Sequence, residues 1–115
     1  MRPSVPMLVV VAREVGLRSS LVARLSMAGC DLVTVDNLDD ARVERWLAHA
    51  PVLIIDDAAL AGRAGGEAAL RSDPRWRAIA VIGGQADEGL MSRIAPADAA
   101  TSLEAMLPEW GYPER

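Results

Sequence analysis

The chain has 115 residues, of which 51% are hydrophobic and 24% charged. A chain of this length and composition forms one folded domain with a hydrophobic core, and its composition excludes intrinsic disorder. The longest apolar run, Met7–Ala12, is too short to cross a bilayer, and the amino terminus carries no signal-peptide pattern. We therefore expect a single cytoplasmic domain over residues 1–115 without a membrane contact.

The charged residues and the metal-binding residue types exclude further functions. The net charge is −4, and the twelve basic residues are all arginines that are scattered along the chain. Without basic clusters, and with 3% aromatic residues, we expect no direct nucleic-acid binding. Cys30 and His49 are the only residues of their types, which excludes an internal disulfide, a cysteine-based zinc site and a nucleophile–histidine pair. We expect Cys30 to fill core space, His49 to end a helix, and the chain not to be an enzyme.

Hydrophobic residues change their spacing along the first third of the chain. The continuous apolar run over residues 7–11 predicts a buried strand. Apolar residues with helical spacing follow over 17–28, and Gly29 ends this predicted helix. The alternating pattern over 31–37 predicts a second strand.

A second helix is predicted over residues 37–50. Asn37 or Asp39 is expected to cap its amino terminus. Its apolar face is expected to consist of Leu38, Ala41, Trp46 and Leu47.

Four branched apolar residues, 52–55, run directly into Asp56 and Asp57. A run this apolar predicts a strand over 52–56 that is buried on both faces, as in a parallel sheet covered by helices. Asp56 would then stand at the carboxyl end of the strand, where open α/β sheets place their functional sites.

The second half of the chain predicts shorter elements. We expect a glycine-containing loop over 60–66, a short helix over 67–72, a strand over 77–84 and a helix over 95–107. Pro74 cannot continue the short helix, and the last helix opens near Asp98. The tail is expected to be loose or to pack Trp110 and Tyr112 on the surface. Strands that alternate with helices predict a doubly wound α/β domain.

In this order the elements resemble the chemotaxis-type receiver domain of two-component response regulators, with a core at about 5–108. The resemblance rests on residues 7–37 with Gly29 as the helix-ending glycine, on the strand that runs into Asp56, on residues 65–84 and on Pro96. It implies a flavodoxin-like sheet of five parallel strands in the order 2-1-3-4-5.

The resemblance also implies a phosphorylation site that this chain has lost. In the family, an acid pair after the first strand holds Mg²⁺ beside a phospho-accepting aspartate, because the metal offsets the repulsion between anions. The aspartate falls on Asp56, but the acid pair falls on Ala12 and Arg13, and Glu14 lies one position beyond. We therefore expect no Mg²⁺ or other cofactor and interpret Asp56 as a vestigial phospho-acceptor.

We call the residues that fall around Asp56 in the resemblance the degenerate pocket: Ala12, Arg13, Glu14, Asp57, Gln85 and Ala95. Two other family features are missing from it. The family has a lysine at the position just before Pro96, where this chain has Ala95. It has a serine or threonine after the fourth strand, where this chain has Gln85. Only ten residues, 86–95, separate Gln85 from Pro96. They can supply a short strand at 90–94, so we expect the fourth helix of the family to be shortened or missing.

Two interpretations of Asp56 remain open. In the first, the Arg13 guanidinium pairs with Asp56, with a gross attraction of about 4 kcal/mol before desolvation. In the second, Asp56 and Asp57, with Glu14 or Asp87, bind Mg²⁺ weakly and permit phosphorylation. Successive strand residues point to opposite faces, so we favour the first interpretation and expect Asp57 to be solvated or to cap a helix.

The leading functional hypothesis is a phosphorylation-independent pseudo-receiver that acts as a protein–protein interaction module in bacterial-type signal transduction. Its partner would be a signalling kinase, a regulator or a second copy of the chain. One alternative is an eroded receiver that accepts phosphate on Asp56 from a histidine kinase. Another is an anion- or nucleotide-sensing domain that uses Arg13, Arg63 and Arg93. The initial Met1 and the tail suggest a standalone protein.

Overall fold

Parallel strands form a central sheet in the computed structural model, which describes residues 5–62, 65–83 and 92–112. The sheet has the order β2-β1-β3-β4-β5, and every neighbouring pair is parallel. The strands are β1 (Leu8–Val11), β2 (Leu32–Thr34), β3 (Val52–Asp56), β4 (Ala78–Ile82) and β5 (Ser92–Ile94). The predicted α/β class with a parallel sheet is confirmed.

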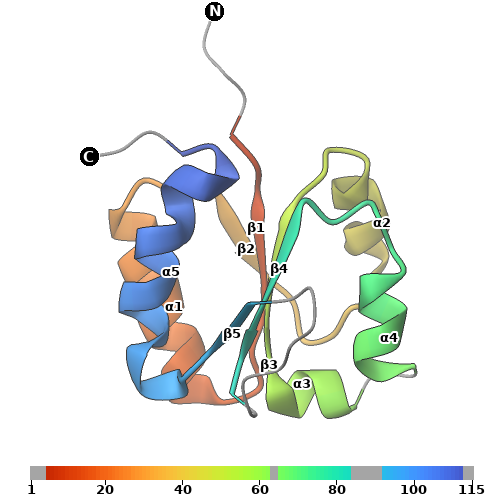
Figure 1. Cartoon of the computed structure of the whole chain (residues 1–115), viewed down its shortest axis with the longest axis horizontal. Coiled ribbons are helices and arrows are strands. Elements are labelled where there is room, and N and C mark those ends of the chain that lie inside the picture. Colours follow the sequence, from red (N-terminus) through yellow and green to blue (C-terminus); the bar gives the residue numbers. More distant parts are fainter. Residues whose placement is uncertain (1–4, 63–64, 84–91, 113–115) are drawn as a thin grey trace, which may run out of the picture.

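Helices cover both faces of this sheet (Figure 1). They are α1 (Val15–Met27), α2 (Ala41–Leu47), α3 (Asp57–Ala61), α4 (Gly66–Arg71) and α5 (Ala99–Met106), with 3₁₀ turns η1 (Pro96–Asp98) and η2 (Leu107–Trp110). Helices α1 and α5 pack side by side on one face, and α2, α3 and α4 lie on the other. Within the described ranges, no helix combines the length and the apolar character that a bilayer crossing requires.

Two hydrophobic clusters, one on each face, follow from the alternation of side chains along the strands. Val10 and Ile54 join the cluster beneath α1 and α5, whereas Val11 and Ile55 join the cluster beneath α2 and α4. All residues of β1 and β3 are buried, which explains why both strands appear in the sequence as unbroken apolar runs.

The helix boundaries of the first half largely match their sequence signals. Gly29 has a φ of 88° directly after α1, a conformation that glycine adopts without strain. The cap of α2 was predicted at the wrong residue: Asp40 accepts from the Arg42 N–H, whereas Asn37 accepts from the Asp39 N–H one turn earlier. The helix is therefore shorter than the expected span of 37–50.

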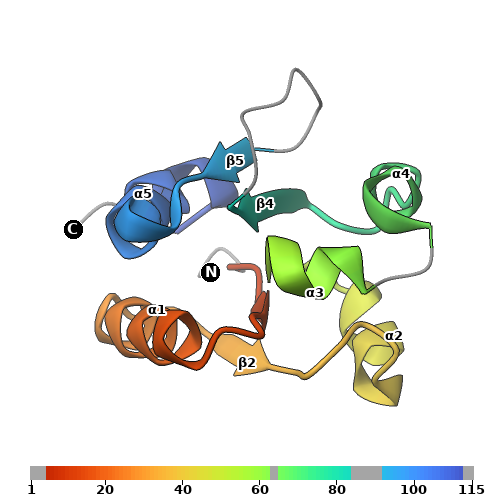
Figure 2. The ribbon, with the colours of Figure 1, turned by 90° about the horizontal axis from the view of Figure 1, so that it is seen from below.

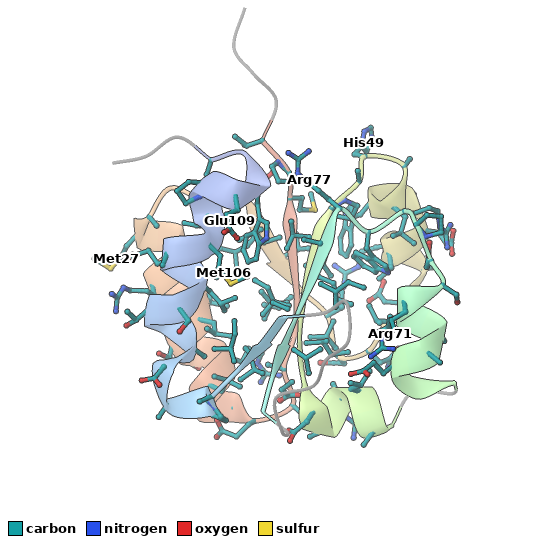
Figure 3. All side chains as sticks on the ribbon, viewed as in Figure 1. Met27, His49, Arg71, Arg77, Met106 and Glu109 are labelled. Atoms are coloured by element: carbon teal, nitrogen blue, oxygen red, sulfur yellow. The ribbon has the colours of Figure 1, made fainter. Side chains whose placement is uncertain are left out.

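The apolar face of α2 also differs from the prediction at two positions. Ala41 is exposed, and Val43 is buried in its place. Trp46 is half-buried, and the Arg42 guanidinium lies 5.5 Å from its ring centroid. His49 lies exposed just beyond the end of this helix, as predicted (Figure 3).

The connection after β3 holds a helix that the sequence did not predict. Residues 60–66 were expected to form a loop, but α3 occupies residues 57–61, because Asp56 caps it. The helix expected over 67–72 is α4, and the strand expected over 90–94 is described as β5. The predicted loss of the family's fourth helix concerns residues 86–91, which lie outside the described residues.

The carboxyl-terminal segment belongs to the core, which corrects the expected loose or surface-packed tail. Trp110 is 4% exposed and Tyr112 is 7% exposed, and both join the cluster beneath α1 and α5. The Tyr112 hydroxyl donates a hydrogen bond to the Pro6 carbonyl oxygen, which ties the segment to the chain just before β1. Burial raises the pKa of Tyr112 to about 12 from its ordinary value of 10.0.

Replacing Tyr112 by Phe is expected to lower the free energy of unfolding by about 1–3 kcal/mol. The ring still packs, but the buried Pro6 carbonyl loses its donor. Urea unfolding followed by tryptophan fluorescence measures this difference. An unchanged unfolding midpoint would contradict the role given to this hydrogen bond.

The same residue predicts a loss of stability at alkaline pH. Tyr112 ionises near its ordinary pKa in the unfolded chain but near 12 in the folded one, so the unfolded state releases the proton first. The contribution of the protonated Tyr112 to the free energy of unfolding is complete below about pH 10, and it is lost as the pH rises toward 12. Unfolding curves across this range should show the loss in the wild type and a flatter dependence in the Tyr112→Phe variant.

Candidate functional site

The carboxyl ends of the strands meet at one edge of the sheet, where α1 and α3 also begin. Figure 2 is seen from this side. The edge carries Ala12, Arg13 and Glu14 after β1, Asp56 and Asp57 at β3, and Gly83 after β4. This is the edge at which open parallel sheets place their functional sites.

Asp56 is a structural cross-link between two connections. Its side chain is 3% exposed, and both of its oxygens accept backbone hydrogen bonds. Oδ2 accepts from the N–H of Arg13 at 2.8 Å and of Glu14 at 3.2 Å, and Oδ1 accepts from the N–H of Ala59 at 2.8 Å. One carboxylate thus fixes the connection between β1 and α1 and starts α3 as its cap.

The expected pair between the Arg13 guanidinium and Asp56 is wrong in its donor. Arg13 contacts Asp56 through its backbone N–H, and no ion pair joins the two residues, both of which the structure describes. The exposed Arg13 side chain lies instead beside Gly62, where a Cβ would come within 3.6 Å of Nη2. The guanidinium therefore extends over the end of α3, away from the cross-link.

Glu14 directs its carboxylate to its own helix. The two oxygens accept from the N–H groups of Gly16 at 3.0 Å and of Leu17 at 2.5 Å, so Glu14 caps α1. Glutamate is not among the preferred capping residues, which explains why the sequence did not indicate this role.

Asp57 is the exposed carboxylate at the end of β3. The strand register pairs Asp56 with Ile82, and the next residue of each strand brings Asp57 beside Gly83. A Cβ on Gly83 would lie 2.8 Å from the Asp57 Cγ, and Gly83 has a φ of 99°. The close approach of this carboxylate thus requires glycine at position 83, a signal that the sequence pattern alone did not reveal.

The donor set at this edge does not fit Mg²⁺, which takes oxygen ligands. Ala12 offers no side-chain donor, Arg13 is a cation, and the oxygens of Asp56 and Glu14 are engaged by backbone N–H groups. Within residues 5–62, 65–83 and 92–112 no group of three acidic, histidine or cysteine side chains is placed to hold a metal ion.

The remaining predicted residues are only partly placed. Ala95 is exposed just after β5, on the same edge of the sheet as Gly83, whose N–H donates to the Ile94 carbonyl at 2.8 Å. Gln85, Asp87 and Arg63 lie outside the described residues, as does the side chain of Arg93.

Comparison with known proteins places the fold. No protein-family model matches the chain, and no curated protein matches it. Among solved structures, a response regulator receiver domain protein from Bacillus halodurans C-125 superposes with a TM-score of 0.70 at 13% sequence identity. The alignment covers 96% of this chain and all of the receiver. The chain therefore has a receiver-like fold.

Replacing Asp56 by Ala is expected to lower the free energy of unfolding by about 3 kcal/mol or more. Three N–H groups at this buried corner would lose their acceptor together. The matched control is Asp57→Ala, one residue later and exposed, for which we expect a change within about 1 kcal/mol. Equal losses in the two variants, measured by urea unfolding, would contradict the structural role of Asp56.

Proposed function

We propose that the chain is a phosphorylation-independent pseudo-receiver that acts as a protein–protein interaction module in bacterial-type signal transduction. The receiver-like fold supports the signalling role. The observation that carries the proposal is the engagement of both Asp56 oxygens by three backbone N–H groups. A phosphoryl group on Asp56 would break the contacts that hold the two connections in place.

The charge at this edge supports the same proposal. Phosphoryl transfer to a carboxylate brings anions together, and a metal ion normally offsets their repulsion. Ala12 and Arg13 stand where carboxylate ligands would be needed, and Glu14 is engaged by its own helix. The proposal therefore includes neither enzyme activity nor a Mg²⁺ requirement.

The partner in this proposal is a protein: a signalling kinase, a regulator or a second copy of the chain. A shortened segment at 86–95 would leave an apolar docking patch beside it, but residues 86–91 lie outside the described residues. Among the described side chains, Val15 and Met27 are 62% and 80% exposed, at opposite ends of α1 (Figure 3 labels Met27). They do not form one patch, so they do not identify the docking surface.

One observation favours a second candidate function, an eroded receiver that accepts phosphate. Asp57 is exposed at the carboxyl end of β3 and lies against Gly83, so it is accessible to a phosphodonor in a way that Asp56 is not. If this chain accepts phosphate, we expect Asp57 rather than Asp56 to carry it.

An amide-resolved NMR titration with Mg²⁺ and then with beryllofluoride, a mimic of aspartyl phosphate, distinguishes the two functions. We expect no saturable shifts at the amides of Asp56, Asp57 and Gly83, and no change in sedimentation behaviour. Asp57→Asn is the suitable variant, because Asp56→Asn also disturbs the buried cross-link. Saturable shifts that disappear in Asp57→Asn would replace the pseudo-receiver by the phospho-accepting function.

A further inference from the structure

A hollow of about 240 Å³ opens at the carboxyl edge of the sheet, between the end of β1, the start of α1 and the segment after β2. Its lining residues are Ala12, Arg13, Arg18, Asp36 and Asn37. A narrower hollow of about 30 Å³ shares Arg13 and Asn37 with it and continues toward α3. The volume lies below the range of drug-sized ligand sites and suits a small molecule.

Two arginines, Arg13 and Arg18, line this hollow, and the Arg13 guanidinium reaches toward Gly62 in the lining of the narrower one. Neither Arg13 nor Arg18 forms an ion pair with any residue that the structure describes. The Arg18 Nη1 donates to the Ala12 carbonyl at 3.3 Å, which holds its guanidinium at the wall while other N–H groups remain available. The Arg13 backbone is fixed by Asp56, so its side chain starts from a defined position.

Three of the neighbouring acids are engaged elsewhere. Glu14 caps α1, and Asp56 accepts backbone N–H groups. Asp40 pairs with Arg42 at 2.9 Å, and the Arg42 guanidinium holds the pKa of Asp40 at about 2. Asp36 lines the larger hollow and Asp39 lines the narrower one, so each hollow has one acid in its lining.

We propose that this hollow binds a small hydroxyl-bearing phosphate monoester. The planar forks of Arg13 and Arg18 suit phosphate oxygens, and the Asn37 amide supplies a further donor. Asp36 can accept hydrogen bonds from hydroxyl groups on the rest of the ligand. This inference goes beyond the proposed interaction module, because it gives the chain a small-molecule input that requires neither Asp56 nor Asp57.

Isothermal titration calorimetry with glycerol 3-phosphate and with inorganic phosphate tests the site. We expect saturable one-to-one binding of glycerol 3-phosphate, weakened about tenfold or more in Arg13→Gln and in Arg18→Gln. The matched control is Arg24→Gln, which removes an arginine of the same helix that pairs with Glu104 at 3.2 Å. The control should bind as the wild type does, and an amide NMR spectrum of each variant verifies its fold.

The outcomes separate the parts of the proposal. No saturable heat up to about 10 mM ligand, which covers dissociation constants near 1 mM, overturns the site. An equal loss in Arg24→Gln overturns it as well, because the binding would then follow overall charge. Asp36→Asn should weaken glycerol 3-phosphate more than inorganic phosphate. If Asp36→Asn raises the affinity for both ligands equally, Asp36 only repels anions, and this result would overturn the hydroxyl contact.

The same titrations are independent of the proposed interaction function. Beryllofluoride reports on a carboxylate at the end of β3, whereas glycerol 3-phosphate reports on Arg13 and Arg18. Binding of glycerol 3-phosphate with no response to beryllofluoride supports both proposals. A beryllofluoride response that Asp57→Asn abolishes overturns the pseudo-receiver and leaves the arginine site unaffected.

Discussion

The buried carboxylate of Asp56 is the interaction on which this edge of the molecule depends. A charged group at 3% exposure is tolerated only where hydrogen bonds replace its hydration, and three backbone N–H groups from two connections do so here. Because the donors belong to the β1–α1 connection and to α3, the carboxylate fixes the positions of these two segments relative to each other. Arg13 supplies one of these donors, so the carboxylate also fixes the point at which the Arg13 side chain leaves the backbone.

Two neighbouring carboxylates at the end of β3 have opposite surroundings. Residues 56 and 57 are adjacent in the chain, yet one is enclosed and the other is exposed beside Gly83. A carboxylate that reacts must be accessible to its reagent, whereas a carboxylate that caps a buried helix start is shielded from solvent. The receiver-like fold therefore does not by itself assign a phosphorylation role, and the surroundings of each carboxylate must decide it.

The fold was predictable where the sequence contains continuous apolar runs and glycines that end helices. Strand β3 lies at the predicted residues, and Gly29 follows α1 as expected. Helix α3 was missed because five residues are too few to show a helical period. The burial of Tyr112 was missed because it depends on a contact with Pro6, more than a hundred residues earlier, which no local pattern encodes.

The candidate site was predictable in its location but not in its contacts. The strand pattern identified the correct edge and the importance of Asp56. Its partners are backbone N–H groups, which every residue except proline carries and which therefore leave no trace in residue types. Arg18 was overlooked for a related reason: it lies one helical turn into α1, so only the folded backbone brings it next to Ala12.

The hydrogen bond between Tyr112 and Pro6 has a mechanical consequence. The two residues lie near opposite ends of the described sequence and in contact with each other, so a pulling force applied between the chain ends loads this contact before it reaches the sheet. Flanking domains joined to both ends of the chain would transmit tension to the buried Tyr112 side chain. The strength of the attachment between the ends, rather than that of the sheet, would then set the force at which the domain begins to open.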